Sequence, residues 1–288
     1  MKKHIYLLAA LAVPAAAQDF DPRDLGAAYA HLLSVVAQPE VAVSNVEIDT
    51  GASDEDLELD VLHLPFYREF GSWYFQASAG YATYTQELSF PEARAELESE
   101  WDALNGIVEA GLVFPVTEAL SWAVGASAGV ARLDNNFSVR GEVDISPDLR
   151  GSLFNWDTNA AIYRAHGSVR YDGQNGDYRL KGVAHLTYSY VDSFSESSEF
   201  DGFSDGSGTA IFLFDVSRRI NDPDAKRRVY VIGHLGSTHF LGDNRDQLGF
   251  DQYFEFGASI GVDKYATGIL FIYGDDVEGL SLTFNYDY

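Results

Sequence analysis

Strict alternation of apolar and polar residues is the feature that most constrains this chain. From residue 41 onward the dominant period is two, which is the pattern of β-strands with two unlike faces. The last segment shows it most clearly, because Leu280, Leu282, Phe284, Tyr286 and Tyr288 alternate with residues that are all polar. Each such strand therefore has one face for an apolar surrounding and one for a polar surrounding.

Twelve segments carry this alternation. Many exceed the roughly 5 to 6 residues of a mean soluble strand and reach the roughly 9 to 11 that cross a bilayer at a tilt. Short connections alternate with long ones, as in a closed barrel with both termini on one side. The sequence predicts an all-β fold, a transmembrane antiparallel β-barrel of about 12 strands, over Val41–Thr50, Glu58–Phe70, Ser72–Glu87, Gly106–Val116, Leu120–Leu133, Thr158–Tyr171, Tyr178–Val191, Gly208–Ile220, Arg228–Phe240, Gln252–Lys264, Thr267–Gly274 and Gly279–Tyr288.

The first 40 residues divide into two further segments. Lys2 and Lys3 precede a short apolar run that ends at an A-x-A site, so residues 1–17 are predicted to be a cleaved secretory signal peptide. Residues 18–40 contain Pro22 followed by apolar residues at helical spacing, which predicts a short N-terminal helical segment that could plug the lumen. The β-barrel then occupies residues 41–288.

Composition excludes several classes of function. The chain has 44 acidic and 19 basic residues and a net charge of −25, which excludes the basic surface that nucleic-acid binding needs. It contains no cysteine, so disulfides, thiolate nucleophiles and cysteine-ligated metals are excluded. No H-E-x-x-H pattern occurs, and neither a cofactor nor a bound metal is expected within the barrel.

Taken together, the signal segment, the alternating strands and the aromatic C-terminal strand resemble a bacterial outer-membrane β-barrel protein. The resemblance implies a location in the outer membrane, contact with lipid and lipopolysaccharide, and recognition of the last strand by the barrel-assembly machinery. The residues of that insertion signal would be Leu280, Leu282, Phe284, Tyr286 and Tyr288.

Within that class, the chain is most similar to the translocator domain of autotransporters, in which twelve strands follow a helix in the lumen. No long passenger precedes the strands here, so the chain resembles the solitary autotransporter-like β-barrels. The resemblance rests on architecture and brings no passenger function with it.

Charged residues on the polar faces are candidates for the lumen. They form a basic stripe on two neighbouring strands and an acidic set on later strands: Arg164, His166, Arg170, Arg179, Lys181, Asp215, Glu255 and Asp263. One interpretation is a charged constriction that sorts permeating solutes. The other is a set of paired charges that fill a narrow, plugged lumen, because buried charges are usually paired.

The predicted long loops carry an acidic excess that is either a solvated rim or a set of ligands for divalent cations, which prefer clustered oxygen atoms. No EF-hand spacing is present. The residues are Asp54, Glu55, Asp56, Glu58, Glu92, Glu96, Glu98, Glu100, Asp102, Asp192, Glu196, Glu199, Asp201, Asp205, Asp275, Asp276 and Glu278.

Three functions stay open from the sequence. The first is a structural or surface-interaction barrel with no chemistry of its own, and the second is a narrow diffusion channel of the porin type. The third is a barrel hydrolase, for which the run from Gly233 to Ser237 offers only His234 and Ser237 and lacks a convincing triad pattern. An exported soluble β-sandwich is the alternative fold, and heat-modifiable migration in mild detergent would separate it from a barrel.

Overall fold

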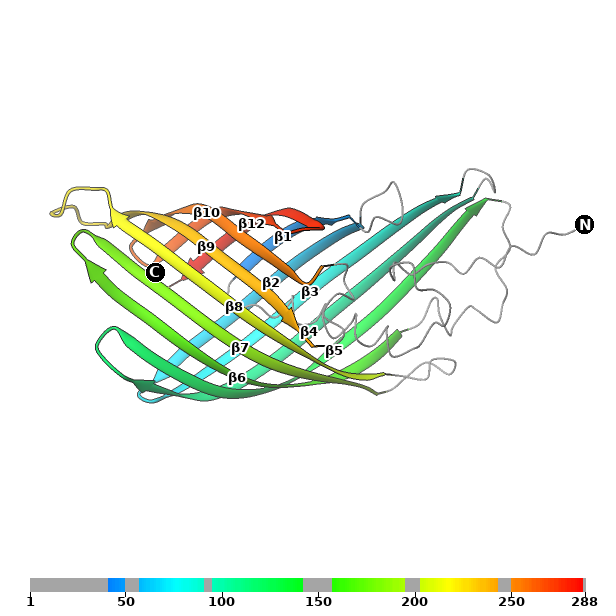
Figure 1. Cartoon of the computed structure of the whole chain (residues 1–288), viewed down its shortest axis with the longest axis horizontal. Helices are drawn as coiled ribbons and strands as arrows, with labels where there is room; N and C mark the ends of the chain where they lie inside the picture. Colours follow the sequence, from blue (N-terminus) through cyan, green and yellow to red (C-terminus); the bar gives the residue numbers. More distant parts are fainter. Residues whose placement is uncertain are drawn as a thin grey trace, which may run out of the picture.

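Twelve antiparallel strands form a closed barrel in a computed structural model that describes residues 41–49, 57–90, 95–141, 157–194, 203–242 and 250–286 (Figure 1). The predicted signal peptide and the predicted helical segment of residues 18–40 lie outside these residues. The strands are β1 (Val41–Ile48), β2 (Leu57–Phe70), β3 (Trp73–Phe90), β4 (Ala95–Pro115), β5 (Leu120–Gly141), β6 (Asp157–Asn175), β7 (Tyr178–Phe194), β8 (Ser204–Arg219), β9 (Val229–Leu241), β10 (Gln252–Val262), β11 (Tyr265–Tyr273) and β12 (Val277–Tyr286).

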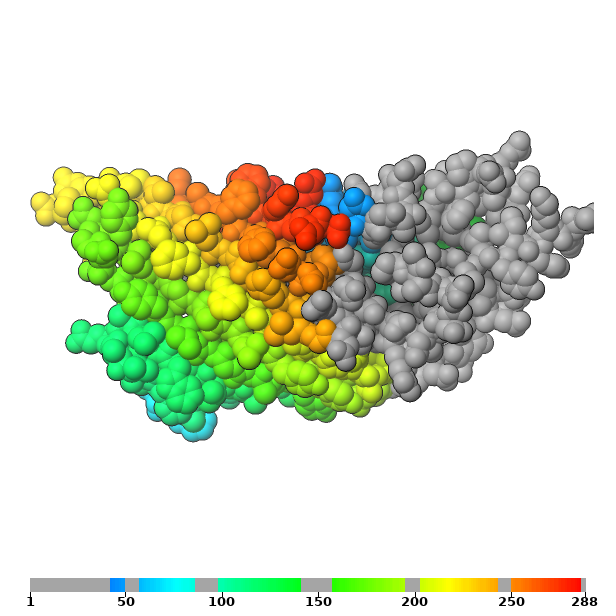
Figure 2. Space-filling view, viewed as in Figure 1, coloured from blue at the N-terminus to red at the C-terminus, as the bar shows by residue number. Residues whose placement is uncertain are grey.

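The barrel closes by pairing its first strand with its last. Strands β1 and β12 run antiparallel, with Val41 opposite Phe284 and Ile48 opposite Val277. The space-filling view shows the two strands side by side, blue against red (Figure 2). All other neighbours are consecutive in the sequence. Closure leaves no edge strand among the twelve, which is the condition for a sheet to stand in hydrocarbon.

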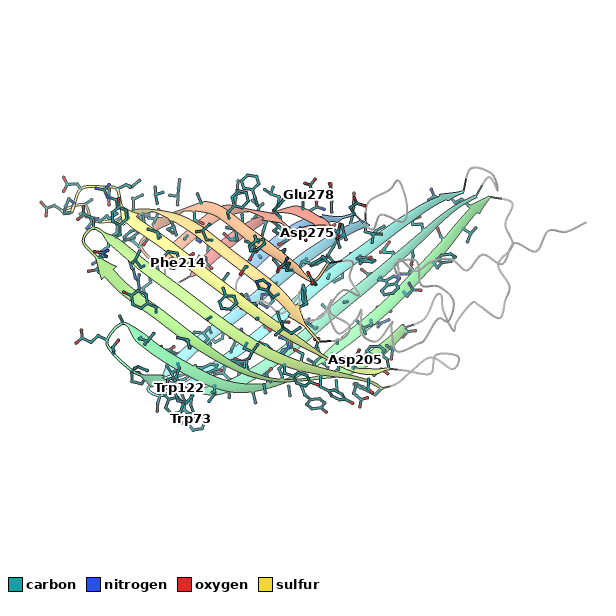
Figure 3. The ribbon with its side chains drawn as sticks, viewed as in Figure 1. Trp73, Trp122, Asp205, Phe214, Asp275 and Glu278 are labelled. Carbon is teal, nitrogen blue, oxygen red and sulfur yellow. The ribbon has the colours of Figure 1, made fainter. Side chains whose placement is uncertain are left out.

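The outward face of the barrel is apolar. Large side chains such as Leu104, Val108 and Phe214 are exposed there, while their sequence neighbours point inward. Trp73 and Trp122 lie close together near the short turns, whereas Asp205, Asp275 and Glu278 lie towards the opposite end (Figure 3). An exposed apolar band with aromatic residues at its border is typical of a transmembrane barrel and confirms the predicted fold.

We call the two ends of the barrel the turn end and the loop end. At the turn end, consecutive strands are joined over Gly71–Ser72, Val116–Ala119, Gly176–Asp177, Ile220–Arg228 and Asp263–Lys264. Gly71 has a φ of 67°, a conformation that glycine adopts without strain. The loop end carries the remaining connections, which include all of the gaps between the described ranges.

Strands β4 and β5 are longer than the sequence pattern predicts. They have 21 and 22 residues, and Glu98, Glu100 and Asp102 lie on the outward face of β4 rather than in a loop. Beyond the apolar band the outward residues face water, so apolar alternation stops although the backbone pairing continues to Ala95 and Gly141. The predicted strand ends therefore mark the edge of the hydrocarbon layer, not the end of the strands.

The inward face has two levels. Towards the loop end it is apolar, with Ile48, Leu57, Leu59, Leu133 and Ile162 completely buried. Nearer the turn end the inward residues are polar and include His63, Asn105, Ser127, His166 and His234. Among the described residues no helix is long and apolar enough to cross a membrane.

Candidate functional site

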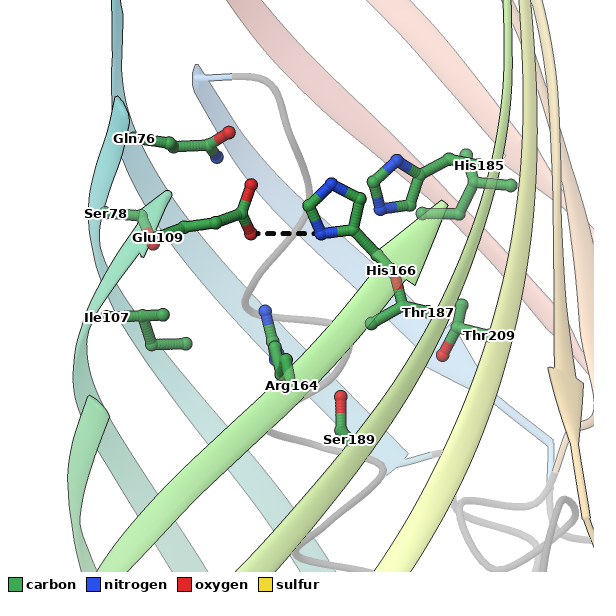
Figure 4. Close-up of a pocket in the computed structure, with 11 residues that line it drawn as sticks. Gln76, Ser78, Ile107, Glu109, Arg164, His166, His185, Thr187, Ser189 and Thr209 are labelled. Carbon is green, nitrogen blue, oxygen red and sulfur yellow. Dashed lines mark ion pairs between the residues drawn. The ribbon is translucent and has the colours of Figure 1, made fainter. Parts of the chain in front are cut away.

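The polar level of the lumen contains a group of side chains that we call the His166 cluster: Tyr74, Glu109, Arg164, His166 and His185. His166 Nδ1 lies 3.3 Å from Glu109 Oε2 (Figure 4). The Tyr74 hydroxyl lies 2.7 Å from His166 Nε2. The rings of His166 and His185 stack with their centroids 4.6 Å apart. Four strands, β3, β4, β6 and β7, thus contribute to one network.

A glycine on the strand between them allows this cluster to form. Glu109 and His166 lie on β4 and β6, and Gly125 on the intervening β5 is directly opposite His166. A Cβ atom on Gly125 would lie 2.0 Å from the Tyr74 hydroxyl and 2.7 Å from His166 Cε1. Because Gly125 has no side chain, Tyr74 and His166 can meet in the space that a side chain would otherwise fill.

Arg164 lies two residues before His166 on the same inward face, beside a cavity of about 50 Å³. Glu109 provides the opposing negative charge for its guanidinium. The hydroxyls of Ser78, Ser189 and Thr209 also line the cavity. This volume is large enough for one or two water molecules, which polar cavities of this kind usually hold.

A second group, the His234 relay, lies on β8, β9 and β10. His234 Nδ1 is 2.7 Å from Asp215 Oδ1, and His234 Nε2 is 2.6 Å from Ser259 Oγ. Asp215 is directly opposite His234 in the sheet, and Ser259 is on the far side of β9. The imidazole is almost fully buried, and so is Ser259, at 3% exposure.

Glycines also surround the serine of this relay. Gly257 is opposite His234, and Gly268 is opposite Ser259. A Cβ atom on Gly268 would lie 1.9 Å from Ser259 Oγ, so any side chain at this position would displace the hydroxyl.

The remaining residues of the predicted basic stripe lie nearer the turn end. Arg170 Nη1 is 2.7 Å from the Tyr67 hydroxyl and 3.3 Å from Glu69 Oε1. Arg179 binds Asp172 through two hydrogen bonds of 2.8 and 2.7 Å. Because these bonds stabilise the ionised carboxylate, and the positive charge of Arg179 adds to them, the pKa of Asp172 is lowered. The side chain of Asp172 is 52% exposed and lies at the turn-end mouth of the barrel, where it faces water.

Three predicted lumen residues lie in different settings. Lys181 is opposite Asp215 on the inward face of β7. Glu255 is on the inward face of β10, close to Gly236 of the next strand. Asp263 lies in the turn between β10 and β11 with a φ of 56°, and its carboxylate accepts a 2.9 Å hydrogen bond from the backbone N–H of Arg228. Asp263 is thus a turn residue at the end of the barrel.

The terminal strand carries the predicted insertion signal on its outward face. Leu280, Leu282 and Phe284 are all exposed there. Tyr286 is the last residue of β12, and Tyr288 lies outside the described residues.

The register assigns partners that the sequence pattern does not indicate. Arg170, His166 and Arg179 pair with Glu69, Glu109 and Asp172 of β2, β4 and β6, while Lys181 lies opposite Asp215 of β8. Ser237 cannot partner His234, because residues three apart on a strand point to opposite faces, and Ser237 lies beside outward-facing Phe212 and Phe254. Tyr74, Glu109, His185 and Ser259 carry no local sequence signal beyond their place on a polar face.

The acidic residues expected at the long loops are only partly described. Those at 54–56, 92, 196, 199 and 201 lie outside the described ranges. Within these ranges no group of three or more His, Asp or Glu side chains is arranged to hold a metal ion.

Comparison with known proteins identifies the architecture. The profile of one family, described as "Solitary outer membrane autotransporter beta-barrel domain", matches residues 41–288. No curated protein sequence matches the chain.

Two solved structures are similar in fold. The translocator domain of the autotransporter NalP from Neisseria meningitidis has a TM-score of 0.54 and 8% identity, over 92% of this chain and 95% of that one. The transport unit of the autotransporter AIDA-I from Escherichia coli has a TM-score of 0.52 and 9% identity, over 94% and 100%. At these identities the similarity concerns the fold alone.

Proposed function

Because the chain belongs to the family of solitary outer-membrane autotransporter β-barrel domains, we propose that it acts without a passenger, as a closed structural or surface-interaction barrel. Membership of the family, together with the exposed apolar band, means that the protein is an integral protein of the outer membrane.

The observation that carries this proposal is the burial of charge across the polar level of the lumen. His166 and His234 have side chains that are 2% and 8% exposed, and their partners Glu109 and Asp215 are 15% and 18% exposed. A conducting channel would instead surround charges of this kind with water. Paired, desolvated groups that interlock from several strands favour a closed barrel.

Conductance in planar lipid bilayers tests the proposal. We expect the purified full chain to give no stable unitary current steps, and we expect the same of a variant that lacks residues 18–40. Steps in the full chain would instead support a narrow diffusion channel, and steps only in the shortened variant would support a channel plugged by that segment. Either result would overturn the closed barrel.

A narrow channel stays the second candidate because the turn-end mouth is open to water. Arg170 and Glu69 form an ion pair there, and their side chains are 29% and 48% exposed. If current steps occur, replacing Arg170 by Gln should change their anion preference, whereas Arg132→Gln, on the outward face, should not.

We further propose that the outward face contacts lipid and lipopolysaccharide and that the barrel-assembly machinery reads the last strand. The exposed Leu280, Leu282 and Phe284 support both. Leu282→Asp would place a charge at the lipid face, which costs less than the about 2 to 4 kcal/mol of Lys or Arg at the bilayer midplane but still destabilises the inserted barrel. We expect Leu282→Asp to remove most of the heat-modifiable protein from the outer-membrane fraction.

Asn285→Asp is the matched control for that test, because it adds the same charge to the inward face of the same strand. It should leave the amount of inserted protein near the wild-type level. Equal loss in the two variants would show that charge alone, and not its position on the outward face, prevents insertion.

A further inference from the structure

We propose that Ser259, His234 and Asp215 form a serine-hydrolase relay inside the barrel that cleaves small carboxylic esters. The three side chains come from adjacent strands and are joined in the order carboxylate, imidazole, hydroxyl by contacts of 2.7 and 2.6 Å. This is the order that activates a serine nucleophile in unrelated folds, where geometry rather than sequence position defines the relay.

The two contacts fix the role of each ring nitrogen. An ionised carboxylate accepts hydrogen bonds and cannot donate one, so Nδ1 of His234 carries the proton that Asp215 binds. Nε2 is then unprotonated in the neutral ring and accepts the O–H of Ser259 at 2.6 Å. His234 is thus held as a base towards Ser259, and Asp215 acts as the positioning residue.

A part-buried pair of serines in the lumen shows what is particular to Ser259. Ser44 and Ser281, on β1 and β12, bind one another at 2.9 Å through their hydroxyls. Neither serine of that pair is hydrogen-bonded to an imidazole in the network described here. A lumen that only had to satisfy its polar groups would be served by pairs of this kind, whereas Ser259 meets a base that is itself oriented by an acid.

The absence of side chains next to Ser259 sets its position. Its Oγ lies against Gly268, where a Cβ atom would come within 1.9 Å. Gly257 and Gly261 flank Ser259 on the same face of β10. Because Ser259 is 3% exposed and Leu270 and Ile232 pack against the flanking glycines, only a compact group could reach its hydroxyl.

The position along the barrel defines the substrate class. Ser259 lies close to the turn between β10 and β11, so an ester would approach from the turn-end mouth. Its acyl group must be short, because Ile232, opposite Ser259, is completely buried. We therefore assign a short-chain carboxylic ester, with water as the second reactant.

The reaction balances with these groups alone. Ser259 Oγ bonds to the ester carbonyl carbon as its proton passes to His234 Nε2; the bond from that carbon to the alkoxy oxygen then breaks, and His234 returns the proton to the leaving alcohol. Water next attacks the acyl-serine, His234 takes its proton and gives it back to Ser259 Oγ, and a carboxylic acid is released. One ester and one water give one alcohol and one acid.

The test uses the full chain folded in detergent, with folding checked by heat-modifiable migration. A small fluorophosphonate probe forms a bond from phosphorus to an activated serine oxygen and loses fluoride. We expect mass spectrometry to find the label on the peptide that contains Ser259. Turnover of p-nitrophenyl acetate should accompany it.

Three variants decide the roles. Ser259→Ala should abolish both signals, and His234→Gln should slow labelling by about 10²- to 10⁴-fold, the usual contribution of a general base. Asp215→Asn should slow labelling while the barrel stays folded. Ser281→Ala removes a buried lumen hydroxyl outside the relay and is the matched control, which should label at the wild-type rate.

Several results would overturn the proposal. These are a folded wild-type barrel that takes no label, a label on any residue other than Ser259, and a His234→Gln variant that labels as fast as wild type. If Ser259→Ala fails to fold, the nearly isosteric Asp215→Asn variant still distinguishes an activated serine from a structural one.

Discussion

His166 and His234 are two imidazoles in the same lumen that contact different hydroxyl groups. In both, a carboxylate lies at Nδ1 and a hydroxyl at Nε2, and in both the hydroxyl lies over a glycine, Gly125 or Gly268. The hydroxyl belongs to Tyr74 in one case and to Ser259 in the other. The same carboxylate and imidazole thus meet a phenol hydroxyl in the His166 cluster and an alcohol hydroxyl in the His234 relay.

The surroundings differ as well. The His166 cluster includes Arg164 and a stacked His185, so its glutamate opposes the positive charge of a buried guanidinium. The His234 relay has a glycine-rich wall, and Lys181 lies opposite its carboxylate, Asp215. The comparison teaches that a carboxylate and an imidazole can either neutralise buried charge or activate a hydroxyl, and that the neighbouring residues decide which.

The largest expected effect is a difference in unfolding free energy between variants of the two carboxylates, Glu109 and Asp215. Glu109→Gln would leave the buried Arg164 without its counter-charge, and breaking a buried pair costs about 3 to 5 kcal/mol. Asp215→Asn leaves a neutral imidazole with an altered partner, for which a loss of about 1 to 3 kcal/mol is expected. Urea unfolding of the two variants in detergent measures the difference, and equal losses would refute the distinction.

Two glycine variants test the same comparison through a stability loss of intermediate size. Gly125→Ala and Gly268→Ala each force a hydroxyl to move, and overpacking of this kind costs about 1 to 3 kcal/mol. Only Gly268→Ala should also reduce fluorophosphonate labelling, since only it displaces Ser259.

The control for these two variants is Gly261→Ala. There the nearest atom to the added Cβ, Ile232 Cδ1, is at 3.4 Å, an ordinary contact. Its unfolding free energy should stay within about 0.5 kcal/mol of wild type. Loss of labelling in Gly125→Ala would contradict the separation of the two networks.

The smallest effect is expected at the mouth, outside the bilayer. Arg179→Gln removes the hydrogen bonds and the charge that lower the pKa of Asp172, and an exposed pair of this kind is worth about 0.2 to 1 kcal/mol. The pair stabilises the fold above the unfolded pKa of the aspartate, and this contribution disappears as the pH falls through its lowered folded value. Unfolding curves of Arg179→Gln and wild type should therefore differ slightly at neutral pH and converge in acid, whereas a gap that widens in acid would show the opposite sign.

The strands could be predicted from the sequence because hydrocarbon imposes one rule on every outward residue. The alternation of Leu280, Leu282 and Phe284 with polar residues is read directly, and all three lie outward. The prediction was less accurate where that rule ends: Glu98, Glu100 and Asp102 face water on a strand that continues, so their charges looked like those of a loop.

The lumen networks were predictable only in part. The two-residue period of β6 places Arg164 and His166 on the inward face. Glu109 and Tyr74, however, reach them across Gly125 of the intervening strand. No local sequence pattern indicates a contact of that kind. The sequence does not indicate Ser259 as a partner of His234, because the two residues are brought together by the register between β9 and β10 and not by their spacing in the chain. Asp215 opposite His234 could be located once the turn of Ile220–Arg228 was known, whereas proximity in sequence favoured Ser237, which faces lipid.

Unequal strand lengths also have a mechanical consequence. The closure between the first and last strands depends on β1, which has 8 residues, while β4 and β5 further round the barrel have 21 and 22. Each residue removed from a ladder takes its share of backbone hydrogen bonds with it. Under heat or lateral tension the cylinder should therefore open at β1, whose ladders to β12 and β2 pair only 8 and 7 residues, and the long strands should remain a curved sheet after the ring has opened.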